Sequence, residues 1–345
     1  MKQYNFFSII IPSFNRADEL TELLKSVQTL RFPRDQFEVI IADDGSTDAT
    51  PQVIEQARQK YDFTLHYFTQ QRQGPGAARN LGMEKARGDF FIFLDSDVMV
   101  PADWLANVKK GLERDQADAY GGPDTFLDSF PPLLKAINYS MTSFITTGGL
   151  RGKKGKKLAK YYPRSFNMGL SRALREKIGG FGNLRHGQDI EFSHRIIKSG
   201  AKVAFIEDAP VFHKRRTSVK RFFRQVFNWG VARINLYKLD AGMLEPLHAM
   251  PAVVTVVFFL TALLAVFFTP FRYLFYLMVL FGVAIVLFSM IHAAIKYRQL
   301  TPALYLPVII PIQIFGYGFG FVYNFINRVI LNRPAKIGFY QNYYK

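Results

Sequence analysis

The stretch Asp89–Pro101, DFFIFLDSDVMVP, decides the fold of this chain. Its first half, Phe90–Leu94, is a short, aromatic and wholly apolar run, which is typical of a buried parallel strand rather than a helix. Asp95, Ser96 and Asp97 follow where the strand should leave the sheet, and in open α/β sheets ligands bind at the carboxyl ends of strands. Two carboxylates this close repel each other unless a cation lies beside them, so the stretch predicts a divalent metal site.

The chain before this stretch alternates strands with helices. We expect strands at 6–14, 37–46 and 64–70, and helices at 17–30, 47–61 and 77–87. Strands separated by helices of this length predict a parallel sheet with right-handed crossovers, as in nucleotide-binding α/β domains. The second strand also ends in two carboxylates, Asp43 and Asp44. This context favours a metal site over the alternative for an isolated Asp-x-Asp, which is a solvated acidic turn.

The last third of the 345-residue chain is strongly apolar. The runs 251–271, 273–295 and 299–327 contain no Asp, Glu, Lys or Arg, and His292 is the one side chain of the second run that could carry a positive charge. Each run can cover a hydrocarbon core of roughly 30 Å, which takes about 20 helical residues. The sequence therefore predicts an integral membrane protein.

The first two runs are expected to cross the membrane at about 251–269 and 273–292, which brings Lys296 and Arg298 back to the starting side. If the third run crosses as well, the cations after it lie on the opposite side, against the positive-inside rule. Its prolines and glycines would also break a straight helix. A crossing segment and a re-entrant or broken segment are both open at this stage.

The amino end, MKQYNFFSIIIPSF, lacks the long apolar core and the small-residue cleavage site of a signal peptide. We therefore expect a multi-pass protein of the cell inner membrane with its front domain in the cytoplasm. The chain contains no cysteine, so disulfides and thiolate metal sites do not enter the argument.

The formal net charge of +17 is concentrated in two segments. Residues 151–177 contain ten Lys or Arg against one acid, and residues 213–238 contain eight with no acid. A basic surface can bind nucleic acid, anionic lipid or a phosphorylated substrate. The neighbouring apolar runs favour lipid and phosphorylated substrate, and a nucleic-acid binder would not need carboxylates at its strand ends.

Five motifs occur in a recognisable order: SIIIPSFNR, EVIIADDGSTD, GPGAARNLG, FIFLDSDVMVP and GQDIEFSHRI. Together they resemble the inverting glycosyltransferases of family 2, over about residues 6–230. The resemblance implies an α/β GT-A domain with a mainly parallel sheet, followed here by C-terminal transmembrane helices. We expect this domain at 1–215, an amphipathic interfacial helical segment at 216–245 and the membrane region at 246–345.

The resemblance also implies transfer of a sugar from a nucleotide diphosphate sugar, with Mg²⁺ or Mn²⁺ bridging the diphosphate. Asp97 resembles the direct metal ligand, and His213 could complete the coordination, although a role away from the metal is equally open for His213. UDP is favoured as the nucleotide because a carboxylate at Asp43 or Asp44 can accept the imide proton of uracil. The residues expected to contact the donor nucleotide are Pro12, Asn15, Asp43, Asp44, Arg79 and Asp95.

The general base is expected at the start of a later helix. The family has an acidic pair there, and HGQDIEFSHRI departs from it because Gln188 replaces the first acid, which leaves Asp189 as the base. Glu191 should project from a different helix face and is expected to be structural. The pocket for donor and acceptor is expected to include Asn167, Gln188, Gln225 and Trp229.

Residues 225–229, QVFNW, resemble the QxxRW motif of processive polysaccharide synthases, except that Asn228 stands where Arg is expected. That departure puts processive polymerisation in doubt. The mixed aromatic and basic residues of 220–238 are typical of a helix in the membrane interface. We therefore expect transfer to a polyprenyl-linked or glycan acceptor in cell-envelope glycan synthesis. The alternatives are a processive synthase and a catalytically inactive nucleotide-sugar scaffold.

Overall fold

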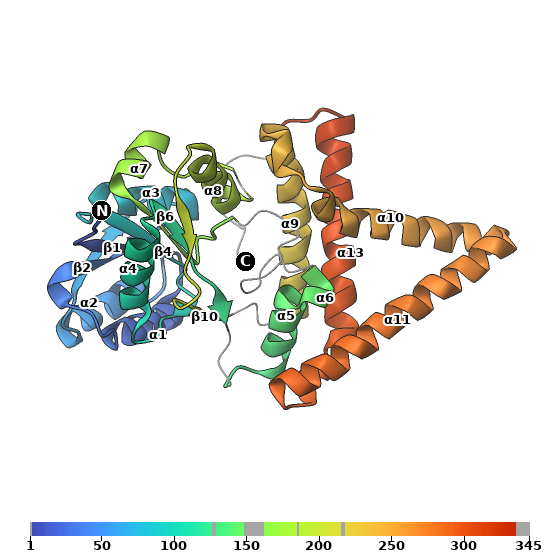
Figure 1. Ribbon diagram of the computed structural model, residues 1–345, viewed down its shortest axis with the longest axis horizontal. Helices are drawn as coiled ribbons and strands as arrows, with labels where there is room; N and C mark the ends of the chain where they lie inside the picture. Colours follow the sequence, from blue (N-terminus) through green and yellow to red (C-terminus); the bar gives the residue numbers. More distant parts are fainter. Residues whose placement is uncertain (1, 126–128, 148–161, 185, 215–217, 336–345) are drawn as a thin grey trace. The chain divides into compact units, whose positions relative to one another are not determined.

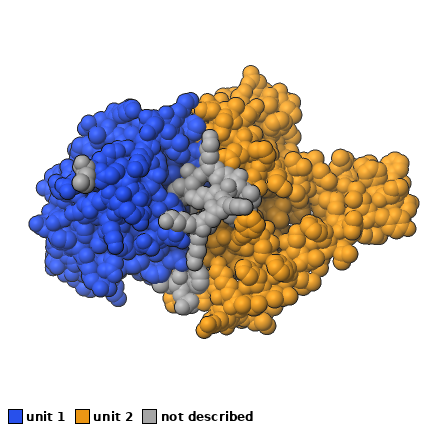
Figure 2. All heavy atoms as spheres, in the orientation of Figure 1, with its two compact units in different colours: residues 1–125, 162–214, 336–345 blue, residues 126–161, 215–335 orange. Residues whose placement is uncertain are grey.

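The computed structural model describes residues 2–125, 129–147, 162–184, 186–214 and 218–335, so the first part of the basic segment 151–177 lies outside the described residues. The chain divides into two compact units (Figure 2). The described part of the first comprises 2–125 and 162–214, and that of the second comprises 129–147 and 218–335.

The first unit contains a seven-stranded sheet in the order β3-β2-β1-β4-β8-β6-β9 (Figure 1). Its strands are β1 Phe7–Ser13, β2 Phe37–Asp43, β3 Thr64–Thr69, β4 Phe90–Leu94, β6 Ala119–Gly121, β8 Asn167–Ser171 and β9 Val203–Phe205. Strands β1 to β4 are parallel to one another, whereas β8 is antiparallel to both β4 and β6. The predicted GT-A-like, mainly parallel sheet is confirmed, with β4 at its centre.

Helices cover both faces of this sheet. They are α1 Ala17–Gln28, α2 Thr50–Lys60, α3 Pro75–Lys85, α4 Trp104–Asp115, α7 Arg172–Ile178 and α8 Gln188–Lys198, with a 3₁₀ turn at Arg34–Gln36. Helix α2 begins later than predicted because Asp48 accepts hydrogen bonds from the backbone and hydroxyl of Thr50 and forms a separate turn.

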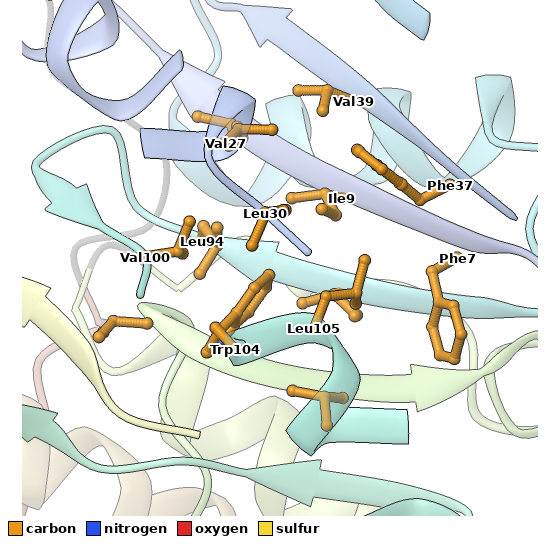
Figure 3. Packing of buried hydrophobic residues seen from close by; sticks show 14 of the residues in the cluster. Phe7, Ile9, Val27, Leu30, Phe37, Val39, Leu94, Val100, Trp104 and Leu105 are labelled. Carbon is orange, nitrogen blue, oxygen red and sulfur yellow. The ribbon is translucent and has the colours of Figure 1, made fainter. Parts of the chain in front are cut away.

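Alternate side chains of the strands pack into two cores because successive residues point to opposite faces. Phe7 and Ile9 of β1 pack with Val27 of α1 and Trp104 of α4 on one face (Figure 3). Ile10, the residue after Ile9, packs on the other face in a cluster that includes residues of α3 and α8. Each fully buried aliphatic or aromatic side chain contributes about 1.5–3 kcal/mol, so the sheet holds the ends of its strands rigidly.

A second, three-stranded sheet lies in the same unit. It consists of β5 Val98–Met99, β10 Val211–His213 and β7 Asp124–Thr125, with β10 in the middle. Strand β10 is antiparallel to β5 and parallel to β7. This sheet joins three segments that are far apart in the sequence.

The second unit is helical. Its helices are α5 Pro132–Thr142, α6 Phe144–Thr147, α9 Val219–Leu239, α10 Pro246–Phe267, α11 Thr269–Tyr297, α12 Thr301–Leu304 and α13 Leu306–Phe325, with a 3₁₀ turn at Ala241–Met243 and a π-helical turn at Ile326–Ile330. Figure 1 shows α13 alongside α9, whereas α10 and α11 extend away from this pair as a hairpin.

By length and composition, three of the described helices could span a membrane: Pro246–Phe267, Thr269–Tyr297 and Leu306–Ile330. The third is one continuous helical segment, so of the two open alternatives a break within 306–330 does not occur. Pro307 lies in the first turn, where its missing N–H is not needed. Gly316 and Gly320 contact α9, which explains why small residues occur there.

Candidate functional site

A cluster of possible metal ligands lies at the end of the central strand. Asp95 and Asp97 follow β4, and His213 ends β10. One ligand atom from each of these three side chains lies within 4.8 Å of the others. His213 Nε2 is 3.2 Å from Asp97 Oδ1, and the backbone N–H of Lys214 donates to the carbonyl of Asp97 at 2.9 Å. Two carboxylates and one imidazole fit a divalent cation such as Mn²⁺.

Asp124 lies on the opposite side of the His213 ring, and the sequence analysis missed it. Its Oδ2 is 3.5 Å from His213 Nδ1, and its side chain is 5% exposed. Strand β7 brings it there, because Asp124 pairs with Val211 of β10. The available sequence signal was a carboxylate shortly after a short apolar strand, β6, the same pattern that identified Asp95.

We expect Asp124→Asn to weaken Mn²⁺ binding by about 10–100-fold, the usual effect of losing a carboxylate behind a ligating histidine. A carboxylate keeps the proton on Nδ1 and leaves Nε2 free for the metal. An amide can instead donate to Nδ1, which moves the proton to Nε2. Electron paramagnetic resonance of free Mn²⁺, titrated with purified protein without donor, measures the affinity.

The control for this prediction is Asp62→Asn, because Asp62 is a surface carboxylate with a 62% exposed side chain. It should leave Mn²⁺ affinity unchanged. If Asp124 acts through His213, adding Asp124→Asn to a His213→Ala variant should cause no further loss. An additional loss in that background would contradict the prediction.

Arg79 of α3 binds the carboxylate that follows β4. Its Nη2 lies 2.5 Å from Asp95 Oδ1, and its side chain is only 6% exposed. The guanidinium also lies 5.4 Å from the centre of the Phe181 ring. Arg79 is therefore a buried cation rather than a surface charge, and its ion pair fixes Asp95.

Asp44 organises the loop between β3 and α3. Its carboxylate is 3% exposed and accepts hydrogen bonds from Gln70 Nε2 at 2.8 Å, from the Gln73 N–H at 2.8 Å and from the Gly74 N–H at 2.7 Å. Gly74 has a φ of +98°, which a residue with a side chain rarely adopts, and α3 begins at the next residue. A contact between Asp44 and the nucleotide base stays a prediction.

Asp43 is buried beside Asp44, but its partners differ. It accepts hydrogen bonds from the backbone N–H of Ser46 at 2.9 Å and from the Tyr67 hydroxyl at 3.1 Å. Burial, together with the charge of Asp43, raises the pKa of Tyr67 well above its ordinary value, so this hydroxyl stays protonated and donates. Both carboxylates at the end of β2 thus hold the surrounding loops in place.

Asn15 connects two loops at the same rim. It has a φ of +52°, and its side-chain oxygen accepts a hydrogen bond from the Thr47 N–H at 2.7 Å. Its own N–H donates to Ser46 Oγ at 2.8 Å. Pro12 is buried within β1 opposite Ala42 of β2, so it supports this rim from the sheet.

Asp189 and Glu191 face different partners at the start of α8. Asp189 is 29% exposed, and its Oδ2 lies 3.4 Å from Arg164 Nη1. Glu191 instead accepts from Arg195 Nε at 2.5 Å and from Arg195 Nη2 at 3.0 Å. Asp189 is therefore the more loosely held carboxylate. Arg164, its cationic partner, was not predicted, because only the tertiary structure brings the two together.

Gln188 anchors the start of α8 against α3. A Cβ built on Gly76 would lie 2.6 Å from Gln188 Oε1, so this amide packs directly against the backbone at Gly76. Gly76 is at the amino end of α3, the helix that carries Arg79. This contact places the beginning of α8 beside the beginning of α3, at the rim that contains Asp95.

Asn167 lies in the core rather than at a pocket surface. It is completely buried, and its amide oxygen lies 3.3 Å from both Trp104 Nε1 and the Tyr120 hydroxyl. Its amide nitrogen donates to the carbonyl of Ala209 at 2.8 Å. These hydrogen bonds hold the side chain inside the fold, and its place in a donor or acceptor pocket stays a prediction.

Gln225 and Trp229 belong to α9 of the second unit. Their place in a donor or acceptor pocket stays a prediction.

Comparisons with known proteins identify a family and a fold. The family model described as glycosyl transferase family 2 matches residues 8–178. Glycosyltransferase AglE of Haloferax volcanii is 27% identical over 246 residues, which covers 71% of this chain and 78% of AglE. A Methanococcus voltae enzyme is 27% identical over 239 residues, which covers 66% of this chain and 73% of the enzyme. Its name describes transfer of a diacetamido-dideoxy-glucuronosyl group to dolichyl N-acetyl-α-D-glucosaminyl phosphate.

Among solved structures, the mannosyltransferase PcManGT of Pyrobaculum calidifontis, in complex with GDP-Man and Mn²⁺, has a similar fold. The TM-score is 0.63 at 21% identity, and the match covers 91% of this chain and 88% of that one. The fold, the carboxylates after β4 and the matched family model lead to one conclusion: this chain belongs to glycosyltransferase family 2, the inverting GT-A transferases, and has apolar helices of membrane length at its C-terminal end.

Proposed function

We propose that this chain is a metal-dependent inverting hexosyltransferase that moves a sugar from a nucleoside diphosphate sugar, UDP-linked by preference, to a lipid-linked acceptor. The observation that carries the proposal is the cluster of Asp95, Asp97 and His213 at the end of β4. It occurs in a chain that also has helices able to span a membrane. A transferase acting on a soluble acceptor would not need such helices.

The reaction joins an acceptor oxygen to the anomeric carbon as the bond from that carbon to the diphosphate breaks. A bound divalent cation supplies the positive charge that stabilises the leaving diphosphate. Asp189 accepts the proton that the acceptor hydroxyl loses, which suits a carboxylate that is partly exposed. Arg79 holds Asp95 in place beside the leaving group.

The second unit offers cations for an acceptor that carries phosphate. Lys135 of α5 is 2% exposed, and its Nζ donates to Gln299 Oε1 at 3.0 Å, which is a neutral partner. Lys296 lies 5.8 Å from the centre of the Tyr139 ring. Among the described residues of this unit the carboxylates are Asp240 and Glu245 alone, and both precede α10. Such a surplus of cations favours a polyprenyl phosphate or diphosphate over a neutral acceptor.

We also propose that the catalytic unit is on the cytoplasmic side of the inner membrane. Lys296 and Arg298 follow the second apolar helix, and Lys and Arg are enriched in cytoplasmic loops. A polyprenyl carrier presents its phosphate at the same headgroup level. The chain's role is then the addition of one sugar, or a few, to a membrane-bound glycan.

The proposal predicts that membranes containing this protein transfer label from a radioactive nucleotide sugar into the organic-solvent extract. Incubation with a panel of UDP and GDP sugars identifies the donor, and membranes from cells lacking the protein give the background. Excess EDTA should abolish the label, and Mn²⁺ should restore it. A labelled product found wholly in the aqueous phase would contradict the lipid-linked acceptor.

A further inference from the structure

We propose that α13 does not cross the membrane. It lies in the membrane interface beside α9, and the chain crosses the bilayer twice, through α10 and α11. This goes beyond the proposed activity, although it rests on the proposed membrane location.

Helix α9 cannot be a membrane span, because charged residues occur along its whole length. Its 21 residues include Lys220, Arg221, Arg224, Arg233 and Lys238. A Lys or Arg at the bilayer centre is costly, and a span needs about 20 predominantly apolar residues. Lys220 and Arg221 are exposed, whereas Phe222 and Val226 are fully buried. A basic outer face and an apolar inner face are typical of a helix that lies at the surface of anionic lipid.

Helix α13 follows α9 closely from one end to the other (Figure 1). A Cβ on Gly320 would lie 1.9 Å from the carbonyl oxygen of Phe227, so the two backbones nearly touch. Later residues of α13 contact later residues of α9. Gly316 lies against Val226, and Gly320 lies against Phe227. Further along, Asn324 donates a 2.9 Å hydrogen bond to Asn235. The two helices therefore run side by side in the same direction, and α13 must share the plane of α9.

Helix α10 meets α13 in a different way, at one crossing. Thr255 contacts Gly318, where an added Cβ would lie 2.0 Å from Thr255 Oγ1, and the rings of Phe259 and Phe319 are 5.4 Å apart. Beyond this crossing α10 and α11 continue away from α13 as a hairpin whose side chains are mostly exposed (Figure 1). If the hairpin spans the bilayer, α13 lies across its base.

The charges after each helix agree with two crossings. Lys296 lies in the last turn of α11 and Arg298 directly follows that helix, whereas Arg328 and Arg333 come after α13. Two crossings place all four on one side, as the positive-inside rule requires, whereas three would place the last two on the opposite side. The exposed apolar residues of α13 then contact the upper acyl region of one leaflet. These residues include Val308, Phe319, Tyr323, Ile326 and Ile330.

The natural chain has no cysteine, so single cysteines report their own positions. Three exposed positions suit the test: Phe268→Cys at the hairpin tip, Leu300→Cys after α11 and Pro334→Cys after α13. Each variant is treated with a membrane-impermeant maleimide in intact spheroplasts and in inverted vesicles. We expect Leu300→Cys and Pro334→Cys to react from the same side, and Phe268→Cys from the other.

Reaction of Pro334→Cys from the side of Phe268→Cys would overturn the inference and establish three crossings. Reaction of all three from one side would overturn it as well, because the hairpin would not span. Protease removal of a C-terminal epitope tag gives a second readout of sidedness in the unsubstituted chain. Recovery of the protein in the soluble fraction would instead refute the membrane location of the proposed function, so the two failures are distinguishable.

Discussion

Asp97→Asn is expected to lower sugar transfer by about 10³-fold or more, because the variant loses a ligand of the cation that stabilises the leaving diphosphate. Asp97 lies 3.2 Å from His213 and within the same cluster as Asp95. A neutral amide keeps the size of the side chain but removes the charge that attracts a divalent cation. Initial rates of transfer, measured with saturating donor and increasing Mn²⁺, give the loss and show how far added metal restores the rate.

The matched control is Asp103→Asn, a carboxylate shortly after the same strand. Its side chain is 55% exposed and forms a surface ion pair with Arg31 at 3.3 Å. Such a pair contributes little to stability, so the rate and the metal affinity should be unchanged. Full activity of wild-type protein in excess EDTA, or a wild-type rate for Asp97→Asn, would refute the metal assignment.

Asp189→Asn is expected to lower turnover by about 10²–10⁴-fold, the usual contribution of a positioned proton acceptor. The amide cannot take the proton of the acceptor hydroxyl, although it can still accept a hydrogen bond from Arg164. Donor affinity should change little, because the donor's phosphates are held at the metal cluster. Binding of a nucleotide diphosphate by calorimetry, measured beside the turnover, separates the two effects.

Glu191→Gln is the comparison variant for this prediction. Glu191 is bound by Arg195, whose guanidinium also donates to the carbonyls of Ile178 and Gly180. Loss of the Glu191 charge should act mainly on stability, seen as a lower melting temperature, and less on turnover. The reason is that the pair with Arg195 holds the loop before α8 in place. If Glu191→Gln reduced turnover more than Asp189→Asn does, the base would be assigned to the wrong carboxylate.

The sequence by itself determined features that depend on short stretches of chain. Strand β4 follows from Phe90–Leu94, because five successive apolar residues must be buried on both faces of a sheet. Asp95 and Asp97 follow directly, so their place at the strand end needs no long-range contact. The membrane-length helices follow equally from uncharged runs.

The partners of these residues were decided by the tertiary structure alone. His213 reaches Asp97 because β10 pairs with β5, and Asp124 reaches His213 because β10 pairs with β7. Nothing in their own segments specifies this pairing. The motif around Asn167 predicts a pocket residue, and the structure shows that its amide also forms four hydrogen bonds inside the fold. The length and hydropathy of α13 are typical of a membrane span, but its glycines pack against the basic helix α9. Periodicity and hydropathy describe one segment at a time, whereas these positions depend on which distant segment lies opposite.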